Sequence, residues 1–102
     1  MQAEHFMIIG EPTRLRILGA LQDSNLAVGE LVSRLKISQP AISKHLKVLR
    51  DAGFVRCHRD AQRRIYALEA EPFREIDEWL APFRKRWSQN LDALESFLDS
   101  EH

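Results

Sequence analysis

The sequence predicts a mainly α-helical domain with one small β-hairpin, in the order α-α-α-α-β-β-α, and three observations lead to this prediction. Apolar residues recur at three- and four-residue intervals through most of the chain, which is the period of an amphipathic helix. Between residues 54 and 68 the period changes to two, as in strands. With 102 residues and 44% hydrophobic content, the chain is long enough to bury a core without disulfides or metal, so we expect one domain over residues 1–102.

The first third of the chain carries the signals of three helices. The segment from Gln2 to Ile9 holds too few apolar residues to be stable alone, so we expect it to pack on another element. Pro12 opens a second helix that runs to Gln22, because proline is tolerated in the first turn of a helix. A third helix, from Val28 to Leu35, is indicated by apolar residues at helical spacing.

A fourth helix is expected between Ile37 and Gly53. Ser38 is a good N-cap, and Gly53 supplies a left-handed C-terminal stop. One side of this helix is an aliphatic stripe, formed by Ile42, Leu46 and Leu49. The opposite side carries hydrogen-bonding and basic residues: Gln39, Ser43, Lys44 and Lys47. Such side chains can bond to base edges and phosphate oxygens, so this face indicates DNA binding.

The short connection before the fourth helix decides the arrangement of the pair. Only residues 36–38 separate the third and fourth helices, which is the turn length of a helix-turn-helix, with Ile37 as the apolar residue that fills the corner. A plain helical hairpin in a small bundle is the alternative, and periodicity alone does not exclude it.

The strands after Gly53 predict a wing attached to the helix-turn-helix. Residues 54–58 and 64–68 alternate as two short strands around a turn from Arg59 to Arg63. Arg59, Arg63 and Arg64 at this tip face one acid, Asp60, so we expect the hairpin to reach a phosphate backbone or minor groove. The alternative is an ordinary solvated turn.

Whole-chain charge hides this organisation. The 15 basic and 15 acidic residues cancel, but nine basic and two acidic residues lie between Arg34 and Arg64, which gives that segment +7. The remaining six basic and thirteen acidic residues give the rest of the chain −7. A basic helix and hairpin set against acidic remaining parts would orient the molecule on a polyanion.

A long last helix is expected from Glu71 or Pro72 to about Leu98. Its apolar residues are spaced alternately by three and four, and they are Phe73, Ile76, Leu80, Phe83, Trp87, Leu94 and Phe97, with Asn90 in the same series and Trp79, Leu91 and Leu98 widening the stripe. Pro82 should kink or split this helix near Trp79.

This stripe exceeds what a domain of this size needs for its own core, so we interpret it as a dimer face shared with the N-terminal helix. The expected interface comprises Phe6, Ile9, Phe73, Ile76, Leu80, Phe83, Trp87, Leu91 and Leu94. Residues 1–10 and 71–98 would then be dimerisation helices around a core of residues 12–70. The alternative is that the aromatic residues cover the core within one protomer.

Export, membrane insertion and catalysis are not indicated. The N-terminus lacks a basic region followed by an apolar run, no segment approaches 18 uninterrupted apolar residues, and one cysteine cannot form an internal disulfide, so we expect a reducing cytoplasm. A Gly-rich phosphate loop and a G-x-S-x-G elbow are missing, so we expect neither an enzyme nor a cofactor. A winged helix that binds only proteins remains an alternative.

Four segments of the chain resemble the ArsR family of winged helix-turn-helix repressors: P-T-R-L-R-I-L-G-A-L, V-G-E-L-V-S-R-L, S-Q-P-A-I-S-K-H-L-K-V-L-R-D-A-G and R-R-I-Y-A-L. The resemblance is strong over residues 10 to 70, and the tail is similar to the branch without a recognised metal site. It implies a homodimeric, often autoregulatory repressor that binds an inverted repeat of double-stranded DNA. The family's DNA-contacting positions fall on Gln39, Pro40, Ser43 and Lys44, with Ser38, His45 and the wing arginines beside them.

Metal sensing, the family's best-known function, does not carry over. Ala27 and Gly29 occupy the positions where soft-metal sensors of the family have Cys-x-Cys. Zinc sensors have Asp-x-His on the last helix, whereas here the residue two positions after Asp77 is Trp79. His5, His45, His58, His102 and Cys57 show no ligand spacing either, so we expect no metal. Cys57 is expected to be a buried small hydrophobe, and a redox-responsive repressor acting through it is the alternative.

Overall fold

The computed structural model describes residues 3–100 and confirms the mainly helical architecture. Its elements are α1 (Ala3–Ile9), α2 (Pro12–Asp23), β1 (Leu26–Ala27), α3 (Val28–Leu35), α4 (Gln39–Asp51), β2 (Val55–Asp60), β3 (Arg63–Leu68) and α5 (Ala70–Ser100). Gln2, where we expected the first helix to begin, lies outside the described residues.

The sheet has three antiparallel strands in the order β1-β3-β2. The expected hairpin is present as β2 and β3, but the prediction lacked β1. In β1, Leu26 pairs with Tyr66 and Ala27 with Ile65. Two residues are too few to show a period in the sequence, and β1 is a strand because the free edge of β3 supplies its hydrogen-bond partners.

The hairpin turn is also shorter than expected. Asp60 pairs with Arg63, so only Ala61 and Gln62 connect β2 and β3, and Arg59, Arg63 and Arg64 belong to the strands. Ala61 adopts a positive φ of 58°, the kind of backbone that tight hairpin turns use. The wing arginines are therefore held at fixed positions of a ladder.

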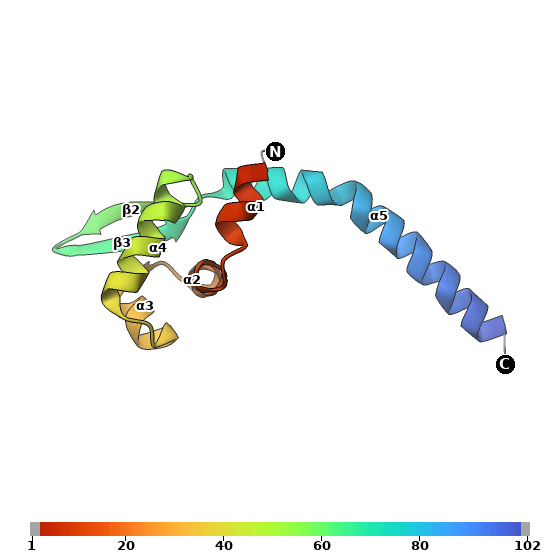
Figure 1. Cartoon of the computed structure of the whole chain (residues 1–102), viewed down its shortest axis with the longest axis horizontal. Coiled ribbons are helices and arrows are strands. Elements are labelled where there is room, and N and C mark those ends of the chain that lie inside the picture. Colours follow the sequence, from red (N-terminus) through yellow and green to blue (C-terminus); the bar gives the residue numbers. More distant parts are fainter. Residues whose placement is uncertain (1–2, 101–102) are drawn as a thin grey trace.

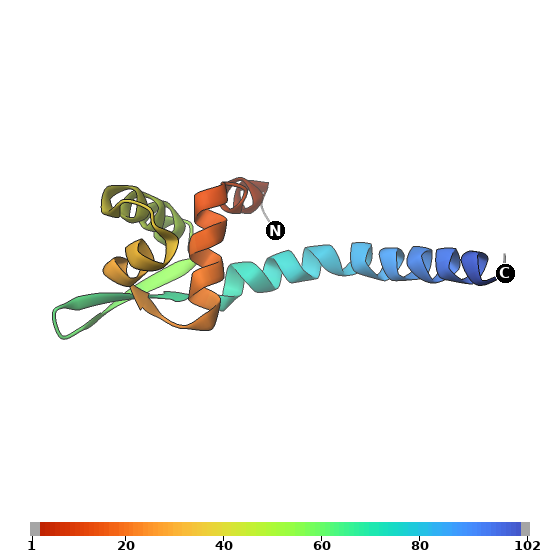
Figure 2. The ribbon, with the colours of Figure 1, turned by 90° about the horizontal axis from the view of Figure 1, so that it is seen from below.

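One hydrophobic core lies between α2, α3, α4 and the sheet. Figures 1 and 2 show how these elements are arranged. Phe54, immediately before β2, is fully buried and meets Phe73 of α5 edge-on at 5.4 Å between ring centroids. The core comprises Ile17, Leu18, Leu21, Leu26, Leu31, Ile42, Leu46, Leu49, Phe54, Val55 and Tyr66. The aliphatic stripe predicted for the fourth helix is thus confirmed.

The joint between α3 and α4 has the expected turn geometry. Lys36 ends α3 in the left-handed conformation, and its N–H donates to the Val32 carbonyl at 2.9 Å. Ile37 packs half-buried against the core, and the Ser38 hydroxyl caps α4 by accepting from the Ala41 N–H at 3.4 Å. The helix-turn-helix prediction is confirmed, and a plain hairpin is excluded by the sheet that packs on it.

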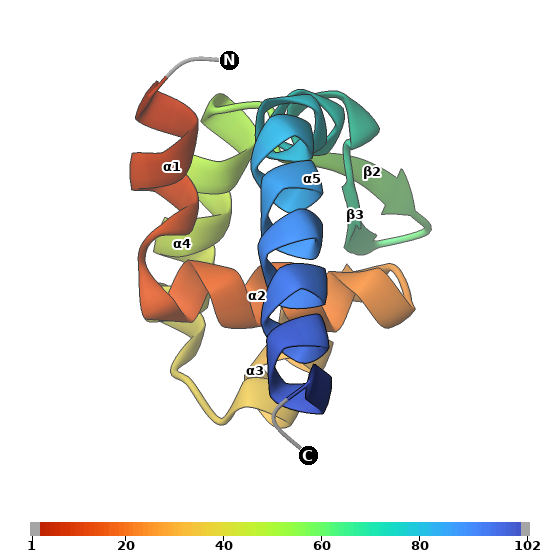
Figure 3. The same cartoon turned by 90° about the vertical axis from the view of Figure 1, so that its right-hand side faces the viewer.

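Helix α5 leaves the rest of the chain and gives the described structure an extent of 63 × 28 × 21 Å. The wing and the C-terminal end of α5 point in opposite directions in Figure 1, and Figure 3 shows α5 in front of the other elements. The helix is continuous but changes direction in its light-blue part in Figure 1, the region that contains Pro82. Pro82 therefore bends the helix and does not split it.

Candidate nucleic-acid interface

Helix α4 presents its polar face to solvent because its aliphatic face is fixed in the core. Ile42, Leu46 and Leu49 are at most 1% exposed, which sets the rotation of the helix about its axis. The exposed side carries Gln39, Pro40, Ser43, Lys44 and Lys47. Burial of one stripe thus brings together the residues that the sequence assigned to DNA.

The ends of this face are partly engaged by neighbouring groups. The Ser38 hydroxyl oxygen accepts a hydrogen bond from the Ala41 N–H, and its O–H can still donate. Lys47 lies 3.5 Å from Asp51, one turn further along the helix, and both side chains are well exposed. A pair this exposed is weak, so Lys47 remains able to turn toward a phosphate.

The wing arginines stand in two different environments. Arg59 and Arg64 are cross-strand partners and both are exposed. Arg63 forms an ion pair with Glu30 at the start of α3, which ties the wing to the helix-turn-helix. The Glu30 carboxylate also accepts from the Ala27 N–H at 3.1 Å, and that bond is the main cause that lowers the pKa of Glu30, with Arg63 adding to it.

A groove lies between the wing and α4, the second helix of the helix-turn-helix, which we call the recognition helix. Ser43, Lys47 and Arg50 of α4 line it together with Arg64 and Tyr66 of β3, and its volume is about 290 Å³. Arg50 was missing from the expected site. It follows Ser43 by seven residues and Lys47 by three, so the same helical spacing that selected those two could have found it. Three cations meet in this groove, which suits a phosphate backbone.

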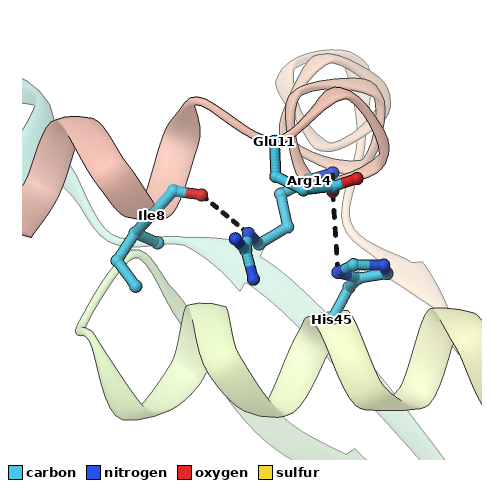
Figure 4. Close-up of polar contacts among 4 residues, drawn as sticks. All are labelled: Ile8, Glu11, Arg14 and His45. Atoms are coloured by element: carbon cyan, nitrogen blue, oxygen red, sulfur yellow. Dashed lines mark hydrogen bonds and ion pairs between the residues drawn. The ribbon is translucent and has the colours of Figure 1, made fainter.

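His45, which we expected beside the DNA-facing residues, lies on the flank of α4 against α2. Its side chain is only 21% exposed, and its Nδ1 lies 3.6 Å from Oε2 of Glu11, the N-cap residue of α2. Figure 4 shows the imidazole turned toward Glu11. The reason is its place on α4, between the buried stripe and the exposed face, where α2 packs against it.

Comparison with known proteins supports this geometry. The family profile described as "Bacterial regulatory protein, arsR family" matches residues 11–56. The HTH-type transcriptional regulator Rv2034 of Mycobacterium tuberculosis is 38% identical over 94 residues, which cover 91% of this chain and 84% of that protein. The chain belongs to the arsR family of bacterial regulatory proteins. It is accordingly a DNA-binding transcriptional regulator with a winged helix-turn-helix fold.

Two further similarities extend over most of this ArsR-family chain. The transcriptional repressor SdpR of Bacillus subtilis is 30% identical over 86 residues, covering 84% of this chain and 96% of that protein. The crystal structure of the transcriptional repressor BigR from Xylella fastidiosa superposes with a TM-score of 0.67 at 29% identity, over 82% of this chain and 84% of that one.

The expected dimer face of this regulator divides into two parts. Ile9, Phe73 and Ile76 pack half-buried against the core of their own chain, so part of the stripe covers the protomer, as the alternative proposed. Phe6 meets Trp79 edge-on at 4.9 Å, which joins α1 to α5. Beyond them every residue from 81 to 100 is exposed, and the large apolar ones are Phe83, Trp87, Leu91, Leu94, Phe97 and Leu98.

Cys57 lies half-buried on β2, opposite Tyr66 of β3. Burial, and then the neighbouring Cys57 thiol, raise the pKa of the Tyr66 hydroxyl. The guanidinium of Arg56 is directed elsewhere, since it donates to the Leu68 carbonyl at 3.2 Å. The thiol thus has no cation aimed at it from Arg56, which agrees with its interpretation as a small hydrophobe.

Within residues 3–100, no three His, Cys, Asp or Glu side chains gather closely enough to hold a metal ion. That the protein senses no metal stays a prediction. One of its four histidines, His102, lies outside the described residues. In the same part of the chain, none of the helices combines the length and apolar character needed to cross a membrane.

Proposed function

We propose that this ArsR-family protein is a sequence-specific transcriptional repressor that binds an inverted-repeat operator in double-stranded DNA as a homodimer, and that it represses its own promoter. The observation that carries the proposal is the set of basic residues on the exposed face of α4, in the groove at Arg50 and on the wing. SdpR and BigR, both named as repressors, favour repression, whereas HlyU of Vibrio cholerae, 45% identical over 67 residues, is named as an activator.

Base recognition falls to the first turns of α4 in this proposal. Gln39 and Ser43 are exposed there and carry hydrogen-bonding groups that match base edges, while Ser38, Pro40 and Lys44 flank them at the same end of the helix. Lys47, Arg50, Arg59, Arg63 and Arg64 would contact phosphates, which position the protein without reading sequence.

Dimerisation supplies the second half-site. The exposed apolar residues of α5 would pack on the same residues of a second copy, with α1 beside them, so that residues 1–10 and 71–98 form the interface and residues 12–70 the DNA-binding part. Two recognition helices related by a two-fold axis enter successive major grooves about 34 Å apart, which predicts half-sites about one helical turn apart.

The test begins with selection of bound duplexes from random DNA and continues with Kd for operator and scrambled duplex across a salt series. Gln39→Ala should weaken operator binding by about 1 to 3 kcal/mol and leave the scrambled duplex nearly unchanged. Arg64→Ala should weaken both duplexes similarly and reduce the salt slope by about 1 per protomer, hence about 2 in a symmetric dimer.

Arg74→Ala is the matched control, because Arg74 is an exposed arginine on α5 away from the basic surface. It should leave both affinities and the salt slope unchanged. A wild-type protein that binds duplexes with no salt slope would support the alternative of a winged helix that binds only proteins. Operator release by oxidant, abolished in Cys57→Ser, would support the redox alternative instead.

A further inference from the structure

Glu11 is a fixed carboxylate between three helices. It caps α2, where its Oε2 accepts from the Arg14 N–H at 2.9 Å. This hydrogen bond is the main cause that lowers the pKa of Glu11, so the carboxylate is ionised at neutral pH. The same oxygen, Oε2, lies 3.6 Å from Nδ1 of His45 on the recognition helix (Figure 4).

The Glu11 carboxylate is the polar group that faces Nδ1 of His45. Its Nδ1 is fully shielded from solvent and makes no hydrogen bond to another described residue. A buried polar nitrogen without a partner is destabilising, so an N–H at Nδ1 directed at Glu11 is the state that its surroundings favour. The remaining ring nitrogen, Nε2, is then an acceptor, which makes a neutral His45 unsuited to bind phosphate.

Two further contacts anchor the partner side of this pair. The Arg14 side chain donates from Nε to the Ile8 carbonyl at 2.7 Å, at the end of α1 (Figure 4). Arg16 donates to the Leu35 carbonyl at 2.8 Å, at the end of α3. The first turn of α2 is therefore tied to α1 and α3, and it offers His45 a rigid attachment point.

We propose, on the basis of the proposed function, that His45 is a positioning residue: its Nδ1 lies 3.6 Å from the Glu11 carboxylate, and the polar contact between the two groups fixes α4 relative to α2, which sets where Gln39 and Ser43 stand against the base edges. The core holds α4 by aliphatic contacts, which tolerate small rotations and shifts along the helix axis. A polar contact at the flank of the helix restricts those movements. Base recognition requires this because its hydrogen bonds depend strongly on distance and angle.

Two variants separate positioning from folding. Glu11→Ser keeps a good N-cap for α2 but is too short to reach His45. His45→Asn places an amide NH2 near the position of Nδ1 and should rescue the contact, whereas His45→Leu removes it. Glu69→Gln is the control: Glu69 lies 3.4 Å from Arg56 of β2, and this ion pair belongs neither to the proposed DNA-contacting residues nor to the proposed dimerisation segments.

The primary measurement is the ratio of the Kd for scrambled duplex to the Kd for operator. Glu11→Ser and His45→Leu should each lower this ratio about tenfold, the size of one lost hydrogen bond, and the double variant should lose no more than either one. His45→Asn and Glu69→Gln should retain the wild-type ratio. The melting temperature of Glu11→Ser should stay close to that of the wild type.

A spectroscopic measurement tests the contact between His45 and Glu11 directly. At pH 8.5 the ring ¹⁵N shifts of His45 should report the Nδ1–H tautomer in the wild type and the Nε2–H tautomer in Glu11→Ser. Unchanged duplex discrimination in Glu11→Ser, with a wild type that does discriminate, overturns the positioning role alone. Equal loss for both duplexes in His45→Leu overturns it too, because that pattern belongs to a phosphate contact. A wild type that binds every duplex equally overturns the proposed function together with this inference.

Discussion

Replacing Trp87 with alanine should weaken the dimer without disturbing the protomer fold. Trp87 lies on α5 beyond Pro82, is 60% exposed, and belongs to no part of the core cluster. A tryptophan side chain contributes roughly 250 Å² of surface, so the exposed part amounts to roughly 150 Å² in each protomer and roughly 300 Å² in a dimer.

This area sets the expected size of the effect. At about 25 cal/mol per Å², complete burial would be worth about 7 kcal/mol, and coverage of half the area about 4 kcal/mol. A loss of about 4 kcal/mol raises the dimer dissociation constant about a thousandfold. Sedimentation velocity over a dilution series should therefore show Trp87→Ala as monomer at concentrations where the wild type is dimeric.

Gln89→Ala is the control, because Gln89 is an exposed polar residue on the same part of α5. It should dissociate at the same concentrations as the wild type. The reasoning is refuted when Trp87→Ala also follows the wild-type curve, since the apolar row of α5 would then not be covered by a second copy. Far-ultraviolet circular dichroism should confirm that the helical content of the protomer is retained.

Three further outcomes follow from local structure. Gly53→Ala should lower the free energy of unfolding by about 1 to 2 kcal/mol, because Gly53 has φ +83°. A Cβ at this position would meet no atom within 4 Å, so the cost is conformational and not steric. Gly19→Ala, in the interior of α2 and equally unobstructed, should stabilise the protein instead. The folded-state pKa of Glu30 is lowered from 4.5, so its contribution to stability is present above that value and is lost as the pH falls through the folded pKa; the difference in unfolding free energy between wild type and Glu30→Gln should be constant near neutral pH and shrink below about pH 4.5. Zn(II), Cd(II) and As(III) should not release the operator, because Ala27 and Gly29 offer no thiolate; a stoichiometric complex in titration calorimetry that changes operator affinity more than tenfold would contradict this.

The helices and the joint between them could be predicted because their signals are local. Ser38, Gly53 and the stripe of Ile42, Leu46 and Leu49 act within a few residues of themselves, and the structure places the caps and the buried face as expected. The charge partition is equally local, since it depends only on the order of residues in the chain. Together these features led to the family that the comparisons support.

The predicted site was less complete where contacts join distant segments. Arg63 pairs with Glu30, 33 residues earlier, and Arg50 meets Arg64 across a groove between α4 and β3. No periodicity links such residues, because the separation along the chain says nothing about which side chains a sheet and a helix bring together. The same reason explains why β1 was missed, since two residues become a strand only beside β3.

The sequence by itself determined the buried stripe of α4, the approximate bounds of the helices and which face of α4 is left exposed, because burial of apolar side chains at helical period requires no knowledge of the partner element. Only the tertiary structure decided that His45 turns to Glu11 rather than outward, and that Phe73 and Ile76 pack on their own core while Trp87 does not. These choices depend on where α2, α5 and the sheet meet in space. Directional contacts and the division of one apolar stripe between core and surface are set by that packing.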